Sequence, residues 1–220
     1  MIDLDTFFIE IKECLALDCP PDKDTADLVR IAEAVVNQNI SFVSVFPEST
    51  EVLWTWLEKT PTKIMSRFYW NQINDVSKLS EQVSHIFKKG ASGAQIFVPY
   101  KMLSNFVSEL GPIRDDLFFN KILSVCLNVD EINALDWEDV FYQVKKIKSD
   151  VLFLDFHNDI KSKQDFVGRI YGFLENFDYE FDGDLHLSLG NDYEKIEQIW
   201  RLVQKIRPEI SPRIKFFLNV

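Results

Sequence analysis

The chain has 220 residues, of which 46% are hydrophobic and 27% charged, which is an ordinary globular composition. Its net charge of −11 excludes the usual attraction to nucleic acid or to an anionic membrane surface, and no basic run offsets it. The amino-terminal stretch is acidic and amphipathic, unlike a signal peptide, and no apolar run approaches the roughly 20 residues that span a bilayer. We therefore expect a cytoplasmic protein without nucleic-acid or membrane partners.

Short apolar runs alternate along the chain with longer segments of helical period, a pattern typical of a parallel sheet with crossover helices. An amphipathic helix is expected first, near residues 3–13. The strands are then expected, in chain order, within residues 14–21, 40–47, 62–70, 93–100, 118–127, 150–156, 184–190 and 213–220. The helices between them are expected within residues 22–39, 49–60, 77–90, 102–110, 129–148, 162–177 and 192–206.

Eight strands with intervening helices predict an α/β fold, a (β/α)₈ TIM barrel formed by one domain over residues 1–220. An open doubly wound sheet is the alternative, although it usually has fewer strands. The helix over residues 1–13 is extra, and no obvious final helix follows the last strand. The outer wall there is either open or covered by the first helix or by a second subunit, so a homodimer is one expectation.

The three cysteines, Cys14, Cys19 and Cys126, are too few and too scattered for a disulfide framework and are expected to be buried thiols. The chain has no spacing of His, Asp or Glu that suggests a metal site. It also lacks a G-x-G-x-x-G or Walker motif, so we expect no cofactor. The cluster around Trp54 and Trp56 has helical spacing and is expected to pack a helix on the barrel.

The segment "KKGASGAQIFVPYKMLSN", residues 88–105, resembles the fourth-strand region of the deoxyribose-phosphate aldolases. Weaker similarity follows in the same order along nearly the whole chain, in "LALDCPPDKDTADLVRIA", "NISFVSVFPEST", "NKILSVCLNVDEI", "SDVLFLDF" and "DLHLSLGNDYEKIEQI". The resemblance implies a TIM barrel of the class I aldolase type, with a sugar-phosphate-like or other small polar ligand.

The residues that such aldolases use for catalysis are replaced in this chain. The resemblance places Phe153 where the family has its Schiff-base lysine, and a phenyl ring is no amine nucleophile. The second lysine falls on or beside His186, and the proton-relaying aspartate falls on Gln95. The phosphate-binding ends of strands seven and eight read 188–190 "SLG" and 216–219 "FFLN", with bulky apolar residues in place of most glycines and serines.

These replacements leave two hypotheses for function, and whether the chain is an enzyme stays open between them. In the first, the barrel lacks Schiff-base aldolase activity and is a pseudoenzyme that binds a small molecule or a partner. In the second, it is an active lyase or isomerase on a small sugar-like substrate, phosphorylated or not, using acid–base groups at the strand ends: Asp18, Asp155 and His186 or His157.

Eight side chains are expected to line a ligand pocket at the carboxyl ends of the strands, where barrel enzymes bind substrates: Asp18, Ser44, Arg67, Gln95, Asp155, His157, His186 and Ser188. Arg67 is expected to contact an anion or to form a salt bridge with Asp18, and Ser44 to be packed. Asp155 could form a proton-transfer pair with His186 or His157; the alternative for His186 is a hydrogen-bonded core histidine. Lys101 and Lys121 are expected to be solvated.

Overall fold

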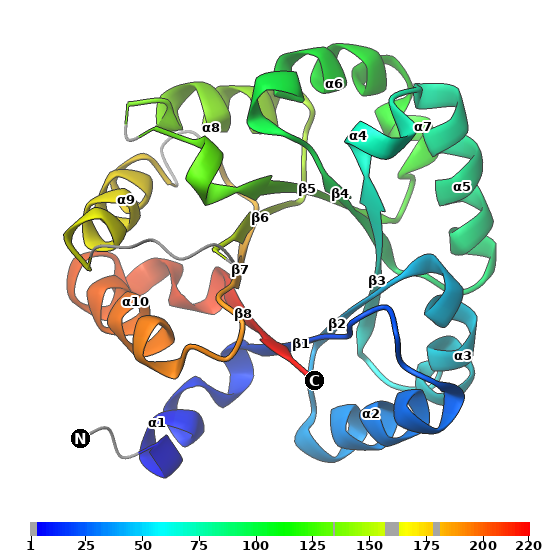
Figure 1. Cartoon of the computed structure of the whole chain (residues 1–220), viewed down its shortest axis with the longest axis horizontal. Helices are drawn as coiled ribbons and strands as arrows, with labels where there is room; N and C mark the ends of the chain where they lie inside the picture. The colour runs from blue at the N-terminus through cyan, green and yellow to red at the C-terminus, as the bar shows by residue number, and fades with distance from the viewer. Residues whose placement is uncertain (1–3, 134, 157–162, 178–180) are drawn as a thin grey trace.

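The computed structural model describes residues 4–133, 135–156, 163–177 and 181–220 (Figure 1). Within these residues, eight parallel strands form a closed barrel in chain order, and the last strand pairs with the first. The strands are β1 (Leu15–Asp18), β2 (Phe42–Val45), β3 (Lys63–Tyr69), β4 (Gly93–Phe97), β5 (Ile122–Asn128), β6 (Val151–Asp155), β7 (Asp184–Ser188) and β8 (Ile214–Asn219). The predicted (β/α)₈ barrel is confirmed.

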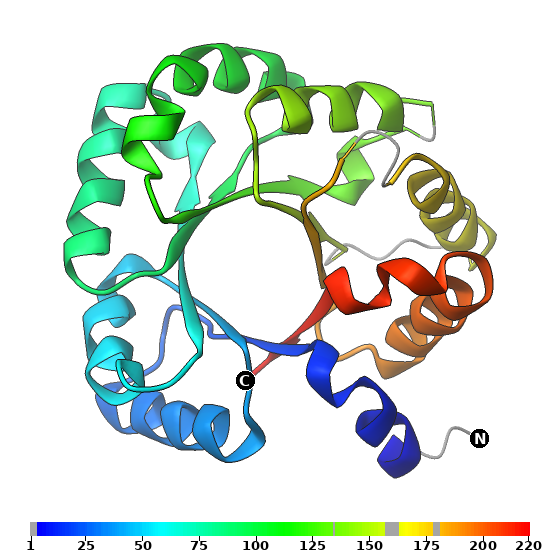
Figure 2. The same ribbon diagram turned by 180° about the vertical axis from the view of Figure 1, so that it is seen from behind.

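Helices surround the strands as an outer ring that is visible from both sides (Figures 1 and 2). The longer ones begin after the strands and return the chain to the start of the next strand. The described helices are α1 (Leu4–Ile11), α2 (Thr25–Gln38), α3 (Pro47–Leu57), α4 (Trp70–Ile73), α5 (Val76–Lys88), α6 (Leu103–Leu110), α7 (Arg114–Leu117), α8 (Trp137–Lys146), α9 (Lys163–Asn176) and α10 (Tyr193–Ile206).

Local sequence signals explain where several helices begin. Asp24 precedes α2, and its carboxylate accepts the backbone N–H of Asp27 at 2.8 Å. Asp75 caps α5 in the same way, and Asp192 caps α10. An aspartate before the first turn satisfies backbone donors that have no partner within the helix, so these starts are encoded locally.

Side chains alternate along each strand between the barrel interior and the helical shell. On β6, Leu152 and Leu154 join the large apolar core beneath the helices. Phe153, between them, belongs instead to a small cluster inside the barrel. This period of two places every second residue of each strand in the interior and decides which side chains can reach the barrel mouth, the end formed by the carboxyl ends of the strands.

The extra helix α1 lies beside α10 and covers part of the wall next to β8. Its Glu10 accepts hydrogen bonds from Trp200 Nε1 at 2.7 Å and from Arg201 at 2.8 Å. β8 is the last element of the described residues. Between α1 and α2 an apolar groove of about 470 Å³ remains over β1 and β8. The wall is therefore partly covered by α1 and partly open within this chain.

The structure corrects two expected boundaries. Strand five begins at Ile122 rather than at Phe118, because Phe118 packs on Phe87 and Asn120 turns the chain with a φ of 55°. The helix expected over residues 129–148 begins only at Trp137. The side chain of Asn128 accepts the N–H of Asp130 at 2.9 Å, and this local turn competes with the helix.

The tryptophans of α3 do not lie on the face of the helix that was expected. Leu53 and Leu57 are buried against the barrel, whereas Trp54 and Trp56 remain 38% and 53% exposed. Positions four apart share a face of a helix, so the two leucines take the inner stripe and the tryptophans lie on the outer surface. The expected packing of this helix on the barrel is therefore made by Leu53 and Leu57 and not by the two tryptophans.

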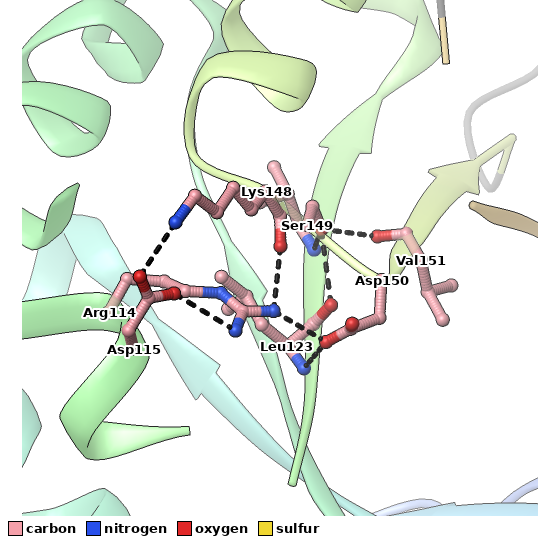
Figure 3. A network of polar contacts seen from close by, with 8 residues as sticks. Arg114, Asp115, Leu123, Lys148, Ser149, Asp150 and Val151 are labelled. Carbon is pink, nitrogen blue, oxygen red and sulfur yellow. Dashed lines mark hydrogen bonds and ion pairs between the residues drawn. The ribbon is translucent and has the colours of Figure 1, made fainter. Parts of the chain in front are cut away.

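A polar network ties α7 to the start of β6 at the end of the barrel opposite the mouth (Figure 3). The Asp150 carboxylate accepts both the backbone N–H of Leu123 at 2.8 Å and the Arg114 guanidinium at 3.0 Å. Arg114 also donates to the Lys148 carbonyl at 2.7 Å, and Lys148 bonds Asp115 at 2.6 Å. Asp150 therefore links a helix, a loop and a strand.

Replacing Asp150 with alanine should lower the free energy of unfolding by about 1–3 kcal/mol, because the Leu123 N–H and Arg114 lose a charged acceptor together. Urea unfolding measures the effect. The matched control is Asp115→Ala, whose exposed carboxylate pairs with Lys148 and Arg114 and should contribute less than Asp150 does. Equal losses in the two variants would contradict the role given to Asp150.

Candidate functional site

Four polar side chains from β1 to β4 meet inside the barrel near its mouth. The Arg67 guanidinium donates to the Asp18 carboxylate and, at 2.7 Å, to Ser44 Oγ. The Ser44 hydroxyl in turn donates to Gln95 Oε1 at 2.5 Å. All four residues are buried. Strand pairing explains the meeting, because Ser44 is the register partner of Asp18 and Gln95 that of Arg67.

The Arg67 charge is neutralised and covered within the chain. Burial lowers the pKa of Arg67, but Asp18 and, to a smaller extent, Tyr69 more than offset that effect, so the pKa is raised and the guanidinium stays charged. Its central carbon lies 4.9 Å from the Phe46 ring centroid and 5.7 Å from that of Phe97. The predicted salt bridge between Asp18 and Arg67 is present, which leaves this cation poorly placed to bind an external anion.

The middle of the barrel is filled by aromatic rings. The Phe153 centroid lies 5.6 Å from that of Phe97 and 5.2 Å from that of Phe217. The His186 ring follows at 5.1 Å from Phe217 and 4.7 Å from Phe42. Phe153, Phe217 and His186 are all buried. At this level the barrel is a packed core rather than a chamber.

His186 is sealed within that core. It is 0% exposed, and neither ring nitrogen has a hydrogen-bond partner among the described residues. Burial, assisted by the charge of Lys215, lowers its pKa to about 3, so the ring is neutral near pH 7. The Lys215 ammonium itself lies toward the opposite end of the barrel, where it donates to the Glu13 carbonyl at 2.7 Å. The expected hydrogen-bonded histidine is thus a buried histidine without such bonds.

Above the rings, the mouth contains a shallow hollow of about 190 Å³, which we call the mouth hollow. Its walls are Tyr69, Asn71, Phe97, Val98, Pro99, Cys126, Asn128, Glu131 and Asp155. The Tyr69 and Phe97 rings stack at 5.0 Å. Glu131 is held in place by the backbone N–H of Tyr100 at 2.8 Å. The charged side chains in the lining are the carboxylates Glu131 and Asp155, and the amides of Asn71 and Asn128 and the Tyr69 hydroxyl add polar groups.

The structure separates some predicted site residues that the sequence placed together. Asp155 lies at the mouth hollow with Ser188 as its register partner, whereas His186 is the partner of Phe153, one inward position deeper. Because the His186 nitrogens have no partner, the expected Asp155–His186 pair is wrong. Ser188 is buried, and His157 lies outside the described residues.

Several residues of the mouth hollow were not anticipated, and the period of two could have found them. Tyr69 is two positions beyond Arg67, and Phe97 is two positions beyond Gln95, so each must face the interior one level higher. Asn128 is the register partner of Asp155 on the neighbouring strand. The Glu131 contribution depends on the turn after β5, which strand alternation does not predict.

All three cysteines are free and buried, as predicted. Burial raises the pKa of the Cys126 thiol well above its ordinary value, so Cys126 lines the mouth hollow as an inert thiol. In the described part of the chain, no group of three or more His, Cys, Asp or Glu side chains could hold a metal ion. None of the helices in those residues has the length and apolar character needed to cross a bilayer.

Solved structures resemble this barrel, although no family model and no curated protein matches the sequence. A tetrameric deoxyribose-phosphate aldolase from Aeropyrum pernix is 9% identical, with a TM-score of 0.73 over 95% of this chain and 86% of its own. A protein from Toxoplasma gondii ME49 assigned as a deoxyribose-phosphate aldolase is 11% identical, with a TM-score of 0.70 over 99% and 93%.

A protein from Streptococcus agalactiae assigned as the copper homeostasis protein CutC is also similar, at 12% identity and a TM-score of 0.62 over 94% of this chain and 98% of its own. The aldolase structures confirm the predicted resemblance to that family's barrel. At such identities the likeness shows the fold alone, and differently named proteins share it, so function has to be argued from the site.

Proposed function

We propose that this barrel does not form a Schiff base with a carbonyl substrate and instead binds a small polar molecule in the mouth hollow. The observation that carries the proposal is Phe153. It occupies the position at which the aldolase resemblance places the nucleophilic lysine, and it packs against Phe97 and Phe217 in the barrel interior. Neither β6 nor β7 contains a lysine. A carbonyl substrate would meet rings rather than an amine.

The hydrogen bonds at the end of β8 support a ligand without a phosphate group. In the aldolase resemblance, backbone amides at the ends of strands seven and eight bind the phosphate. In this chain the Asn219 N–H donates to Asn191 Oδ1 at 3.1 Å, and the Asn191 amide donates back to the Asn219 carbonyl at 3.2 Å. The Val220 N–H donates to the Asp18 carbonyl at 3.1 Å. These amides are already engaged within the chain, so a phosphate would have to displace protein hydrogen bonds.

The lining of the mouth hollow supports the same ligand class. Asp155 and Glu131 are its charged members, and the partly exposed rings of Tyr69 and Phe97 also line it. Carboxylates repel a phosphate and accept hydrogen bonds from hydroxyl or ammonium groups, while rings favour sugar faces or cations. We therefore expect an uncharged or cationic polar molecule, such as a free sugar or an amino sugar.

The alternative, an acid–base lyase or isomerase, has lost two of its expected groups. Asp18 is committed to Arg67, and His186 is sealed among rings. Asp155 is the expected acid–base residue of the described chain that still borders the mouth hollow. With Asp18 and His186 unavailable, the described residues give less support for catalysis than for binding, so we place binding first.

Two measurements test the proposal. Incubation with an aldehyde followed by borohydride should leave no adduct on any lysine inside the barrel, whereas an aldolase with a Schiff-base lysine is trapped under the same conditions. Peptide mapping by mass spectrometry locates any product. An adduct on a barrel lysine would overturn the non-aldolase half of the proposal.

Thermal shifts with a panel of free sugars, amino sugars and sugar phosphates test the binding half. Unphosphorylated members should stabilise the protein by mass action, and Asp155→Leu should abolish the shift. Asp116→Leu, the same change on the exposed face of α7, is the matched control and should keep it. A shift that survives Asp155→Leu, or one confined to sugar phosphates, would contradict binding of an unphosphorylated ligand at the mouth hollow.

A cytoplasmic location and a homodimer also remain proposals. Three buried free thiols fit a reducing compartment. The open groove between α1 and α2 is a surface that a second copy could cover. Sedimentation velocity tests the dimer, and a monomer at all concentrations would rule it out.

A further inference from the structure

The end of the barrel opposite the mouth contains a second cavity, which no part of the proposed function uses. It measures about 520 Å³ and lies where β3 and β5 begin. Its wall includes three lysines, Lys63, Lys88 and Lys121, and one acidic side chain, Glu58. We call it the lysine cavity. Basic side chains thus outnumber acidic ones in this cavity, whereas in the whole chain 35 acidic residues outnumber 24 basic ones.

Lys121 is held in place rather than freely solvated. Its ammonium donates to the Ala91 carbonyl at 2.6 Å and lies 5.2 Å from the centroid of the Phe87 ring. The side chain is half-buried, contrary to the solvated lysine expected from the sequence. Burial and the nearby charge of Lys63 both lower the pKa of Lys121. Lys121 and the exposed Lys63 thus border one cavity as like charges.

No carboxylate within the described residues compensates these charges by an ion pair. Lys63, Lys88 and Lys121 form none there, whereas the adjacent Lys89 pairs with Glu51 at 3.0 Å. Bringing like charges together costs free energy, which an anion bound between them would recover. The arrangement is therefore that of a site for a multivalent anion.

One wall of the lysine cavity is a fixed aromatic surface. Trp54 lies against Gly90, where an added Cβ would be only 2.2 Å from the Trp54 ring, and Gly90 has a φ of 99° that other residues rarely adopt. The Trp54 ring remains partly exposed and borders the cavity. A flat ligand group could stack on it while its anionic group reaches the lysines.

We propose that the lysine cavity binds a phosphate group carried by a small molecule with a planar ring. Phosphate provides up to two negative charges and several acceptor oxygens, which match three ammonium donors. The volume exceeds that of a phosphate alone, and Trp54 supplies a surface for the remainder. The lysine cavity is separate from the mouth hollow, so this proposal does not depend on the function proposed for the mouth hollow.

Calorimetric titration with adenosine monophosphate, inorganic phosphate and adenosine, at constant ionic strength, tests the site. Adenosine monophosphate should bind most tightly, phosphate more weakly and adenosine without measurable heat. Binding should weaken as salt increases. Lys63→Gln and Lys121→Gln should each lower the affinity for adenosine monophosphate at least tenfold. The matched controls, Lys78→Gln and Lys101→Gln, change lysines outside the cavity lining and should leave the affinity within twofold.

The thermal midpoint without ligand separates binding from folding. The Lys63→Gln midpoint should equal or exceed that of the original chain, because the repulsion of Lys121 is relieved. Absence of binding by either phosphate-bearing probe, equal binding of adenosine, or full affinity in both cavity variants would overturn the proposal. Asp155→Leu should leave adenosine monophosphate binding unchanged, and a loss there would place the ligand at the mouth instead.

Discussion

Replacing Asp18 with asparagine should lower the free energy of unfolding by about 3–5 kcal/mol, a large effect for one polar side chain. The change leaves the Arg67 guanidinium charged and buried, without the carboxylate that stabilises it. Ser44 remains as an acceptor but cannot neutralise the charge. Equilibrium unfolding in urea measures the loss.

The double variant Asp18→Leu/Arg67→Met tests the physical reason. Removing both charges also removes the desolvation penalty, so the double variant should be more stable than Asp18→Asn despite the larger change. Asp27→Asn is the matched control, because its pair with Arg30 lies on the surface at 3.6 Å and should contribute less than about 1 kcal/mol. A loss under 1 kcal/mol in Asp18→Asn would show that the buried pair is not needed for stability.

Replacing His186 with leucine should make the protein more resistant to acid. The folded-state pKa of His186 is lowered from 6.5 to about 3. Between these values the unfolded chain binds a proton that the folded chain cannot accommodate, so stability is retained above pH 6.5 and lost as the pH falls toward 3. The leucine variant lacks this group. Its free energy of unfolding, relative to that of the original chain, should therefore rise by about 1 kcal/mol per pH unit on acidification.

Urea unfolding of both proteins at pH 7, 6, 5 and 4 measures the difference between their free energies of unfolding. Both proteins contain the same carboxylates, so the effect of carboxylate titration cancels in this difference. His85→Leu, the same substitution at an exposed position of α5, is the matched control. At pH 7 His186→Leu should also be at least as stable as the original chain, since two buried nitrogens without partners are removed. A pH-independent difference would mean that the histidine is hydrated or bonded in the folded protein.

Strand alternation predicts some residues of the mouth hollow from the sequence, but not all of them. The position of Arg67 near the mouth, and its pairing with Asp18, could be expected from the ends of their strands. Tyr69 and Phe97 follow from the same alternation, two residues further on. Glu131 does not, because the turn that places it depends on a hydrogen bond from Tyr100, which belongs to a different strand–helix unit.

The surroundings of His186 are not predicted by strand alternation. Alternation indicates that it faces the barrel interior, but not which side chains surround it there. Phe42 and Phe217 come from β2 and β8, and only closure of the barrel brings their rings against His186. A histidine at the same position beside Asp155 would be an acid–base group, whereas one between two phenyl rings is core.

The sequence by itself determined the eight strands, the caps of several helices and the absence of lysine from β6 and β7, because periodicity and capping depend on residues close together in the chain. Only the tertiary structure decided that phenyl rings fill the barrel, that Arg67 is neutralised and that Lys63 and Lys121 share a cavity. Those contacts join residues far apart in sequence, and their geometry is set by strand register and barrel closure, which no local pattern encodes.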